Sequence, residues 1–245
     1  MNKIVLRAQY ACRGFPARGL GRIAPSNILV GGLGRQPQYD FDMKGKFIVF
    51  EGIDGSGKTT QIEMLEKRLK SEGKKVYRTA EPTSAASGKM LREALSGSVK
   101  RTPGELAALF LLDRINHNVN SEDGIKKLID EGYCVICDRY YYSSLAYQGS
   151  DIDGEWVARM NLDCPEIAVP DVCVFLDVSP ELAIERISKN RETTEIYEKK
   201  EKLADVREKY FKVFEKLKGR DNIKVIDASG SPEEVAERIY KTIEN

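Results

Sequence analysis

Histidine is nearly absent from this chain, because His117 is the only one among 245 residues. A lone histidine excludes Ser-His-Asp and Cys-His catalytic groups and metal sites built from several imidazoles. Any catalytic chemistry must therefore rest on lysine, arginine, aspartate and a bound metal ion.

Long apolar runs and an excess of charge of one sign are missing as well. No segment approaches the roughly 20 consecutive apolar residues that a membrane-spanning helix needs. The chain has 39 Lys and Arg against 38 Asp and Glu, so the overall charge gives no sign of a nucleic-acid or membrane partner. We expect neither.

The five cysteines do not predict a disulfide framework, because their number is odd and their spacing is irregular. Cys134 and Cys137 match the C-x-x-C motif, but they lie in an apolar run. Residues three apart on a strand point to opposite faces. We interpret this pair as part of a packed strand and not as a redox or metal site.

The most informative segment present is Gly52-x-x-x-x-Gly57-Lys58-Thr59, which matches the phosphate-binding loop. A short apolar strand, 46–50, precedes it, and an amphipathic helix, 60–69, follows. Glycines let successive backbone N–H groups face one oxyanion, and the helix N-terminus adds partial positive charge. A glycine-rich turn that matches by chance is the alternative, but the order of strand, loop and helix favours a nucleotide site.

Each residue type in this loop predicts a role. Lys58 can reach the β- and γ-phosphates of a nucleotide, and the Thr59 hydroxyl can bind Mg²⁺. The expected nucleotide-binding residues are Gly52, Ile53, Asp54, Gly55, Ser56, Gly57, Lys58, Thr59 and Thr60.

Residues 1–42 differ from the rest, with six basic side chains and no acidic one before Asp40. They have no lasting helical or strand period. Three interpretations are open: an upstream stretch included by a mis-assigned start, a targeting peptide, or a basic tail. We favour a start at Met43, and we expect residues 1–42 to be disordered and dispensable.

From Met43 on, strand-like apolar runs alternate with helical patterns, which predicts an α/β phosphate-loop fold of three layers. We expect one domain, 43–245, built on a five-stranded parallel sheet with helices on both faces. The expected strands are Phe47–Glu51, Lys75–Thr79, Tyr133–Asp138, Val172–Asp177 and Lys224–Asp227. Capping signals mark helix starts at Thr102-Pro103-Gly104-Glu105, Ser179-Pro180 and Ser231-Pro232-Glu233-Glu234.

Ligands of such sheets bind at the carboxyl ends of the strands. Polar groups follow the second, third and fourth strands at Glu81, Asp138-Arg139 and Asp177, and we expect them to converge on the phosphate loop. Asp138 is placed to hold a magnesium ion, and the Arg139 guanidinium is suited to an oxyanion. A surface ion pair at a strand end is the alternative for these two residues.

Two other groups suggest a second nucleotide site and a lid. Phe110 and Arg114 are four apart on a predicted helix, so they can stack on a base and bond its edge, although Phe110 is equally suited to core packing. Arg186, Lys189 and Arg191 belong to a charged stretch, about 186–200. It predicts either a basic lid over the transferring phosphoryl group or a solvated helix face.

Four segments together resemble one known family. Residues 138–149, DRYYYSSLAYQG, are similar to its D-R-Y/H…S-x-x-A-Y-Q-G segment, and residues 50–60, FEGIDGSGKTT, are typical of it. So are Glu81-Pro82-Thr83 and Phe110-x-x-Asp113-Arg114. Over residues 43 to about 245 the chain resembles thymidylate kinases. The lid pattern, with Asn190-Arg191-Glu192, is similar to that of archaeal members.

The resemblance implies transfer of the γ-phosphoryl group of ATP to dTMP, with Mg²⁺, by a cytoplasmic homodimer. It implies catalytic roles for Lys58, Asp138, Arg139 and Arg191, with Thr59 and Asp138 as metal ligands. It implies that Asp54 lies near the sugar 3′-hydroxyl and the metal, that Phe110 stacks on thymine, and that Arg114 bonds the base edge. The implied substrate-binding residues are Asp54, Glu81, Arg92, Phe110, Arg114, Arg139, Ser144, Tyr147 and Gln148.

Within this set, Arg139 would clamp the acceptor phosphate, with Arg92 as a second candidate, and Tyr147 would crowd the 2′ position. Thr83-Ser84 stands where many bacterial members have Gly-Gly, which leaves the role of Arg92 and the identity of the lid arginine open. Two rival functions remain. One is a deoxynucleoside kinase or a kinase of another nucleoside monophosphate, and in a nucleoside kinase Glu81 would be the base. The other is a phosphate-loop switch or ATPase without a small acceptor.

Overall fold

The computed structural model describes residues 45–188 and 195–244. The expected extension, 1–42, lies outside the described residues, as do Lys189 and Arg191 of the expected lid. No helix in the described part of the chain has the length and apolarity that a membrane crossing requires.

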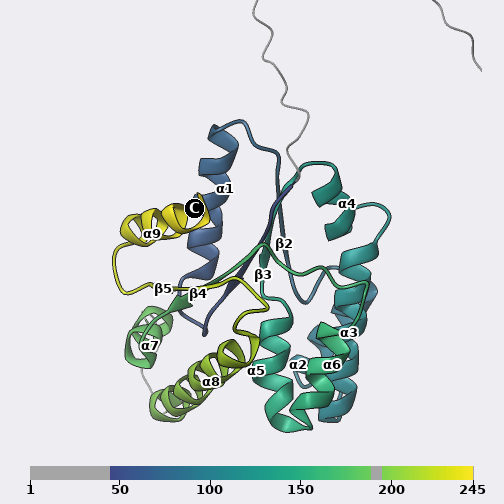
Figure 1. Ribbon diagram of the computed structural model, residues 1–245. Coiled ribbons are helices and arrows are strands. Elements are labelled where there is room, and N and C mark those ends of the chain that lie inside the picture. Colours follow the sequence, from purple (N-terminus) through teal and green to yellow (C-terminus); the bar gives the residue numbers. More distant parts are fainter. Residues whose placement is uncertain (1–44, 189–194, 245) are drawn as a thin grey trace, which may run out of the picture. The chain divides into compact units, whose positions relative to one another are not determined.

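One parallel sheet forms the centre of the described domain (Figure 1). Its strands are β1 (Phe47–Glu51), β2 (Val76–Ala80), β3 (Cys134–Asp138), β4 (Val172–Asp177) and β5 (Ile223–Asp227), in the order β2-β3-β1-β4-β5. The predicted five-stranded parallel sheet is confirmed. Every residue of β1 is buried, because β1 is the central strand with β3 and β4 as its neighbours. Cys134 and Cys137 are buried in β3 as free thiols.

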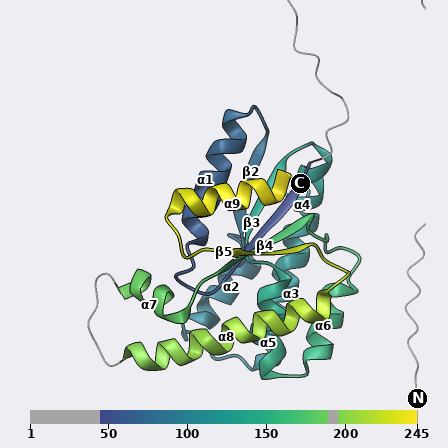
Figure 2. The ribbon, with the colours of Figure 1, turned by 60° about the vertical axis from the view of Figure 1, so that its left-hand side comes forward.

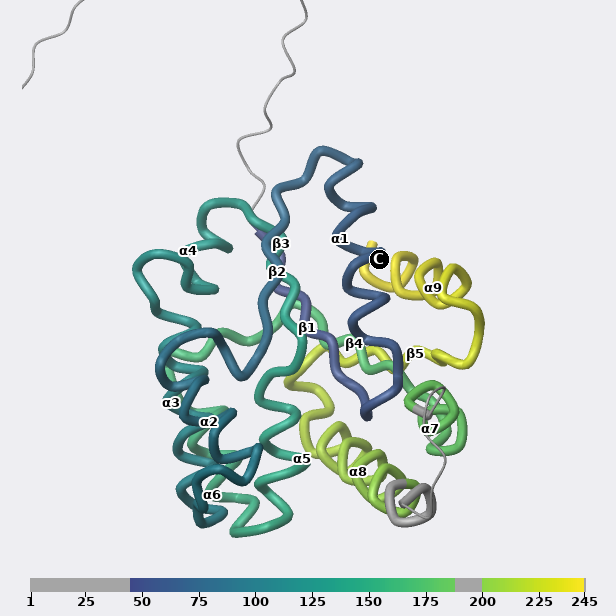
Figure 3. Tube along the Cα trace, turned by 180° about the vertical axis from the view of Figure 1, so that it is seen from behind, coloured from purple at the N-terminus to yellow at the C-terminus, as the bar shows by residue number. Residues whose placement is uncertain are grey.

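Helices cover both faces of this sheet. α1 (Lys58–Ser71) and α9 (Pro232–Glu244) pack together on one face, and α3 (Pro103–Val119) and α4 (Ile125–Asp130) lie on the other (Figure 1). Seen from behind, α2 (Ala86–Leu95), α3 and α6 (Gly154–Leu162) form a group away from α1 and α9 (Figure 3). The predicted apolar face of α1 is confirmed, since Ile62, Leu65 and Leu69 are buried.

The remaining helices lie at the edge where β1 ends. These are α5 (Tyr141–Asp151), α7 (Pro180–Ser188) and α8 (Glu195–Leu217), of which α7 and α8 lie below the sheet in Figure 2. The apolar residues of α8 pack on Phe175 of β4, and Tyr210 is among them.

Local hydrogen bonds explain where several helices begin. At the start of α3, the Glu105 N–H donates to Thr102 Oγ1 and the Thr102 N–H donates to Glu105 Oε2, which is the predicted capping box. Ser231 and Glu234 form the same reciprocal pair before α9. These caps satisfy backbone donors that the first helical turn leaves without partners.

Candidate active site

The phosphate-binding loop joins the end of β1 to the start of α1. Gly52 and Gly57 adopt φ values of 150° and 94°, a region that favours glycine. A Cβ atom at Gly52 would lie 2.6 Å from Ser56 Oγ and 2.9 Å from the Leu176 carbonyl oxygen, so there is no room for a side chain. The loop is therefore closely packed against β4 and opens at the N-terminus of α1.

Lys58 is folded back onto this loop. Its Nζ donates to the carbonyl oxygens of Gly52 at 3.0 Å and Ile53 at 3.3 Å. Burial, with a further contribution from the positive charge of Arg139, lowers the pKa of Lys58 to about 8. The carboxylates of Asp138, Asp54 and Glu51 act in the opposite direction but do not outweigh burial, so the charge of a bound phosphate would further favour the ammonium form.

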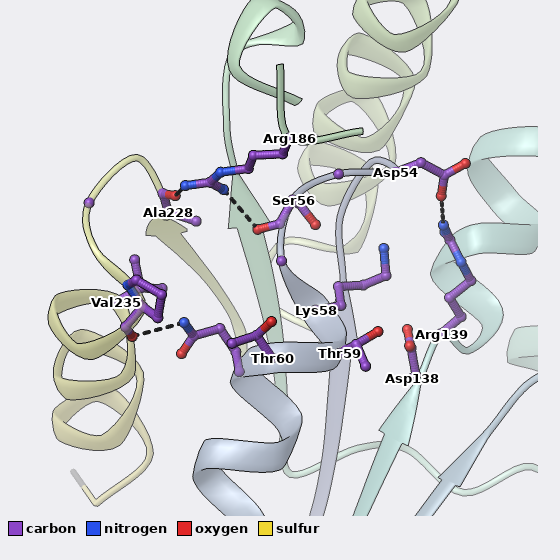
Figure 4. Close-up of a pocket in the computed structure, with 15 residues that line it drawn as sticks. Asp54, Ser56, Lys58, Thr59, Thr60, Asp138, Arg139, Arg186, Ala228 and Val235 are labelled. Atoms are coloured by element: carbon purple, nitrogen blue, oxygen red, sulfur yellow. Dashed lines mark hydrogen bonds and ion pairs between the residues drawn. The ribbon is translucent and has the colours of Figure 1, made fainter. Parts of the chain in front are cut away.

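A cavity of about 670 Å³ opens in front of the loop. The phosphate loop and Arg186 line one side, and the segment between β5 and α9 lines the other (Figure 4). Arg186 connects the two sides, because its Nη1 donates to the Ser56 carbonyl and its Nη2 to the Ala228 carbonyl. The far side consists of Ala228, Gly230, Pro232 and Val235.

This far side of the cavity was not predicted from the sequence. The only sequence signal for it is the Gly230-Ser231-Pro232 loop after the fifth strand. That signal marks a turn and a helix start without indicating a ligand.

Asp138 and Thr59 both line the cavity, next to Lys58 (Figure 4). Asp138 Oδ1 is buried and has no hydrogen-bond partner within residues 45–188 and 195–244. A buried carboxylate oxygen without a partner is unfavourable, and a cation would satisfy it. Among the described residues no group of three His, Cys, Asp or Glu side chains could hold a metal by itself. A metal bound here would therefore need phosphate or water oxygens as well, which suits Mg²⁺.

Arg139 begins the connection after β3 with an unusual backbone, because its φ is 68°. Its Nη2 donates to Asp54 Oδ1 at 2.6 Å. Its Nη1 donates to Ser143 Oγ at 3.3 Å and Tyr210 Oη at 3.2 Å. Within the described residues, these bonds use both Nη1 hydrogens and one Nη2 hydrogen, and the Tyr147 side chain also interacts with the guanidinium, so at most Nε–H and one Nη2 hydrogen remain for a ligand.

Asp54 was expected near the sugar 3′-hydroxyl and the metal, and in the structure it pairs with Arg139 at the mouth of the cavity. Glu51 was not among the predicted site residues. Its side chain is fully buried and accepts a hydrogen bond from the Tyr210 hydroxyl. Nothing in the sequence of β1 distinguished Glu51 from a residue that merely ends the strand.

A second polar cluster lies between α3 and α5, after β2. Arg114 is 1% exposed, and its Nε and Nη2 donate to Glu81 Oε2 at 2.9 and 2.6 Å. Arg114 also donates to Ser144 Oγ and Asn161 Oδ1. His117 Nδ1 lies 3.0 Å from the other oxygen of Glu81. Glu81 is thus engaged on both oxygens, which does not suit a free general base.

Three other expected acceptor residues lie on α3 and α5. Phe110 lies one helical turn before Arg114 and is half-buried. Tyr147 and Gln148 on α5 are half-buried as well, and the Arg139 guanidinium lies 6.0 Å from the Tyr147 ring centre. Ser144, Tyr147 and Gln148 are spaced to share one face of α5.

Arg92 and Asp113 organise the loop after β2. Arg92 Nη1 donates to the carbonyl oxygens of Pro82 and Thr83, so in this structure its guanidinium holds the loop. Asp113 accepts from the Thr83 N–H, the Thr83 hydroxyl and the Ser87 hydroxyl. Asp113 thereby anchors the start of α2, a role that its place in the Phe110-x-x-Asp113-Arg114 motif did not predict.

Of the four expected strand-end groups, the phosphate loop and Asp138-Arg139 line the cavity, Glu81 lies in the second polar cluster, and Asp177 lies in neither. Its carboxylate forms a bidentate ion pair with Arg207 of α8, at 2.6 and 2.8 Å. Asp177 therefore fixes α8 to the end of β4.

Comparison with known proteins identifies the family. The model of the thymidylate kinase family matches residues 50–239. Among relatives, "Thymidylate kinase" of Caldicellulosiruptor saccharolyticus is 35% identical over 209 residues, which is 83% of this chain and 98% of the relative. "Probable thymidylate kinase" of Methanocaldococcus jannaschii is 38% identical over 201 residues, 81% of this chain and 96% of the relative. "Probable thymidylate kinase" of Pyrobaculum aerophilum is 41% identical over 199 residues, which is 80% of this chain and 95% of the relative. The chain therefore belongs to the thymidylate kinase family, whose members phosphorylate dTMP to dTDP with ATP.

Proposed function

We propose that the phosphate loop holds ATP as the donor, with its phosphates at the N-terminus of α1 and its nucleoside between Arg186 and the segment after β5. The cavity continues without interruption from Lys58 to Val235, which supports this direction for the donor. Lys58 would leave the loop carbonyls and neutralise the β- and γ-phosphates, where its charge is favoured.

Thr59 and Asp138 are the proposed ligands of Mg²⁺. The unpartnered Asp138 Oδ1 beside Thr59 supports this assignment. When bound, Mg²⁺ neutralises charge on the transferring phosphoryl group. The protein contributes a hydroxyl and a carboxylate at the edge of the cavity, and Lys58 next to them.

The single observation that carries the acceptor assignment is the arrangement of Arg139. Its remaining Nε–H and Nη2–H can bind one phosphate, and Arg139 borders the donor cavity. The acceptor phosphate has a second pKa of about 6, so it is mainly dianionic at neutral pH and needs no base. Catalysis would then consist of positioning and charge neutralisation.

The base of dTMP would occupy the space next to Phe110 and Arg114. Phe110 would stack on thymine, and Arg114 would donate its remaining Nη1 hydrogen to the base edge. Glu81 and Ser144 would hold Arg114 in place, as their hydrogen bonds to it suggest. Tyr147 would exclude a 2′-hydroxyl, and Gln148 would line the same pocket.

The proposal includes three further properties that the family implies. Arg191 lies outside the described residues, and we retain it as the lid arginine because the phosphate loop has no arginine of its own. A homodimer and a cytoplasmic location are also retained. Light scattering of the purified protein and cell fractionation would test them.

A coupled assay of ADP release with Mg·ATP tests the function directly. The acceptors are dTMP, dUMP, dGMP, AMP, CMP and thymidine, each with the full chain and with a protein that starts at Met43. We expect strong turnover with dTMP, weaker turnover with dUMP and little with the rest, for both proteins. Turnover of thymidine would instead indicate a nucleoside kinase, and ADP release that no acceptor changes would indicate a switch or ATPase.

A further inference from the structure

Glu51 is the most completely buried acid of the site, and four donors converge on it. Its side chain is 0% exposed at the end of the central strand. Oε1 accepts from the backbone N–H groups of Tyr140 at 2.9 Å and Ser143 at 3.2 Å. Oε2 accepts from the hydroxyls of Ser143 and Tyr210, both at 2.8 Å. A buried carboxylate with this many donors has an organising role, because leaving any donor unpaired would be unfavourable.

Both hydroxyls that donate to Glu51 also contact Arg139. When Ser143 and Tyr210 donate their single protons to Glu51, their oxygen lone pairs remain available to the two Nη1 hydrogens of Arg139. Burial raises the pKa of Glu51, while the positive charge of Arg139 and the hydrogen bonds that Glu51 accepts act in the opposite direction and favour the carboxylate that receives both hydroxyl protons. The two hydroxyl oxygens lie 2.9 Å apart and either could donate to the other, so a Glu51 carboxylate that accepts both protons selects one direction for the network.

Tyr210 comes from a different part of the chain than the rest of the network. It lies on α8, 159 residues after Glu51, and it is fully buried. Its ring packs on Phe175 and Phe214, with ring centres 5.0 and 5.9 Å away. The aromatic ring therefore secures α8, and the hydroxyl is left to act on Glu51 and Arg139.

We propose that Glu51 and Tyr210 form a buried positioning pair that orients Arg139 toward the acceptor phosphate, a role that rests on the proposed function of Arg139. Tyr210 and Ser143 hold Nη1, and Asp54 holds one hydrogen of Nη2. The guanidinium plane is then fixed with Nε–H and the other Nη2–H directed to the ligand. Because both side chains are fully buried, each would act on the acceptor only through Arg139.

Tyr210→Phe tests this role, because it removes one oxygen atom and keeps the ring that packs on Phe175. We expect kcat/KM for dTMP to fall about 10- to 100-fold, through a higher KM for dTMP and a lower kcat, while KM for ATP stays unchanged. In a protein that already carries Arg139→Ala, Tyr210→Phe should lower kcat/KM for dTMP by less than about a further twofold, because the guanidinium on which Tyr210 acts is absent.

Tyr141→Phe is the matched control. Tyr141 is also fully buried, but its hydroxyl donates to Asp221, away from Arg139. We expect wild-type kinetics from it. A second test variant, Glu51→Gln, should change the dTMP parameters in the same direction as Tyr210→Phe.

These measurements distinguish a failure of the proposed function from a failure of the positioning role. If the wild-type protein does not turn over dTMP, the proposed function fails first. If it does, and Tyr210→Phe leaves the dTMP parameters unchanged or its effect adds fully to that of Arg139→Ala, the positioning role is refuted. An equal loss in Tyr141→Phe would also refute it, because the effect would then come from general loosening.

Discussion

Arg139 combines two properties that substitution can separate: a left-handed backbone and a guanidinium group. Arg139→Ala removes the guanidinium but keeps a Cβ atom at φ 68°. Arg139→Gly removes the guanidinium and also relieves the backbone conformation, because glycine adopts positive φ without steric conflict. The difference between the two variants isolates the backbone, and their shared loss isolates the side chain.

The magnitude for the side chain follows from its remaining donors. Among the described residues, at most Nε–H and one Nη2–H remain for the proposed acceptor phosphate, and a hydrogen bond to a charged group contributes about 1.5–3 kcal/mol. Two such bonds correspond to about 3–6 kcal/mol, or a loss of roughly 10²- to 10⁴-fold in kcat/KM for dTMP. For the backbone, we expect the glycine variant to be more stable than the alanine variant by about 1 kcal/mol.

The coupled assay measures the first effect, and urea denaturation of the two purified variants measures the second. KM for ATP is the internal control, and we expect it to stay unchanged because the proposed donor site keeps Lys58 and Thr59. Unchanged dTMP kinetics would remove Arg139 from the acceptor site. Equal stability of the two variants would show that the left-handed conformation is not strained.

Three further substitutions or treatments test other parts of the site. Arg114→Met leaves Glu81 buried without its countercharge, so we expect urea denaturation to show a loss of about 3–5 kcal/mol, and a loss below about 1 kcal/mol would contradict the buried ion pair. Asp138→Asn should change stability by less than about 1 kcal/mol but lower kcat at least about 100-fold and raise the Mg²⁺ concentration for half-maximal activity. An unchanged Mg²⁺ titration would exclude Asp138 as a ligand. Burial raises the pKa of Cys137 well above its usual value, whereas Cys164 is half-buried. Since the thiolate is the reactive form, alkylation of the native protein at pH 8 should label Cys164 before Cys137, and peptide mapping that finds equal rates would contradict the structure.

The phosphate loop was predictable from sequence because its function depends on neighbouring residues. Gly52, Gly57 and Lys58 act through local backbone geometry and through a helix that begins at the next residue, so their spacing carries the information. The capping box at Thr102 was predictable for the same reason. The strands were visible as apolar runs, because β1, β3 and β4 are buried on both faces.

Two expectations from sequence concerned residues whose internal contacts the motif could not show. Arg92 holds the loop after β2, and its role in substrate binding stays a prediction, whereas Asp177 forms an ion pair with Arg207. In both cases the residue type suits an anion or a metal as well as it suits the internal partner. A charged side chain near a strand end therefore indicates the edge of the sheet, but not which group it will contact.

The sequence by itself determined the family, the parallel α/β fold and the phosphate loop, since these depend on local periodicity and on short spacings. Only the tertiary structure decided how Arg139 is held and where the far side of the donor cavity lies. Glu51, Arg139 and Tyr210 come together because β1 pairs with both β3 and β4, and because α8 packs on β4. That strand order is a property of the whole chain, and no local pattern encodes a contact between residues 159 positions apart.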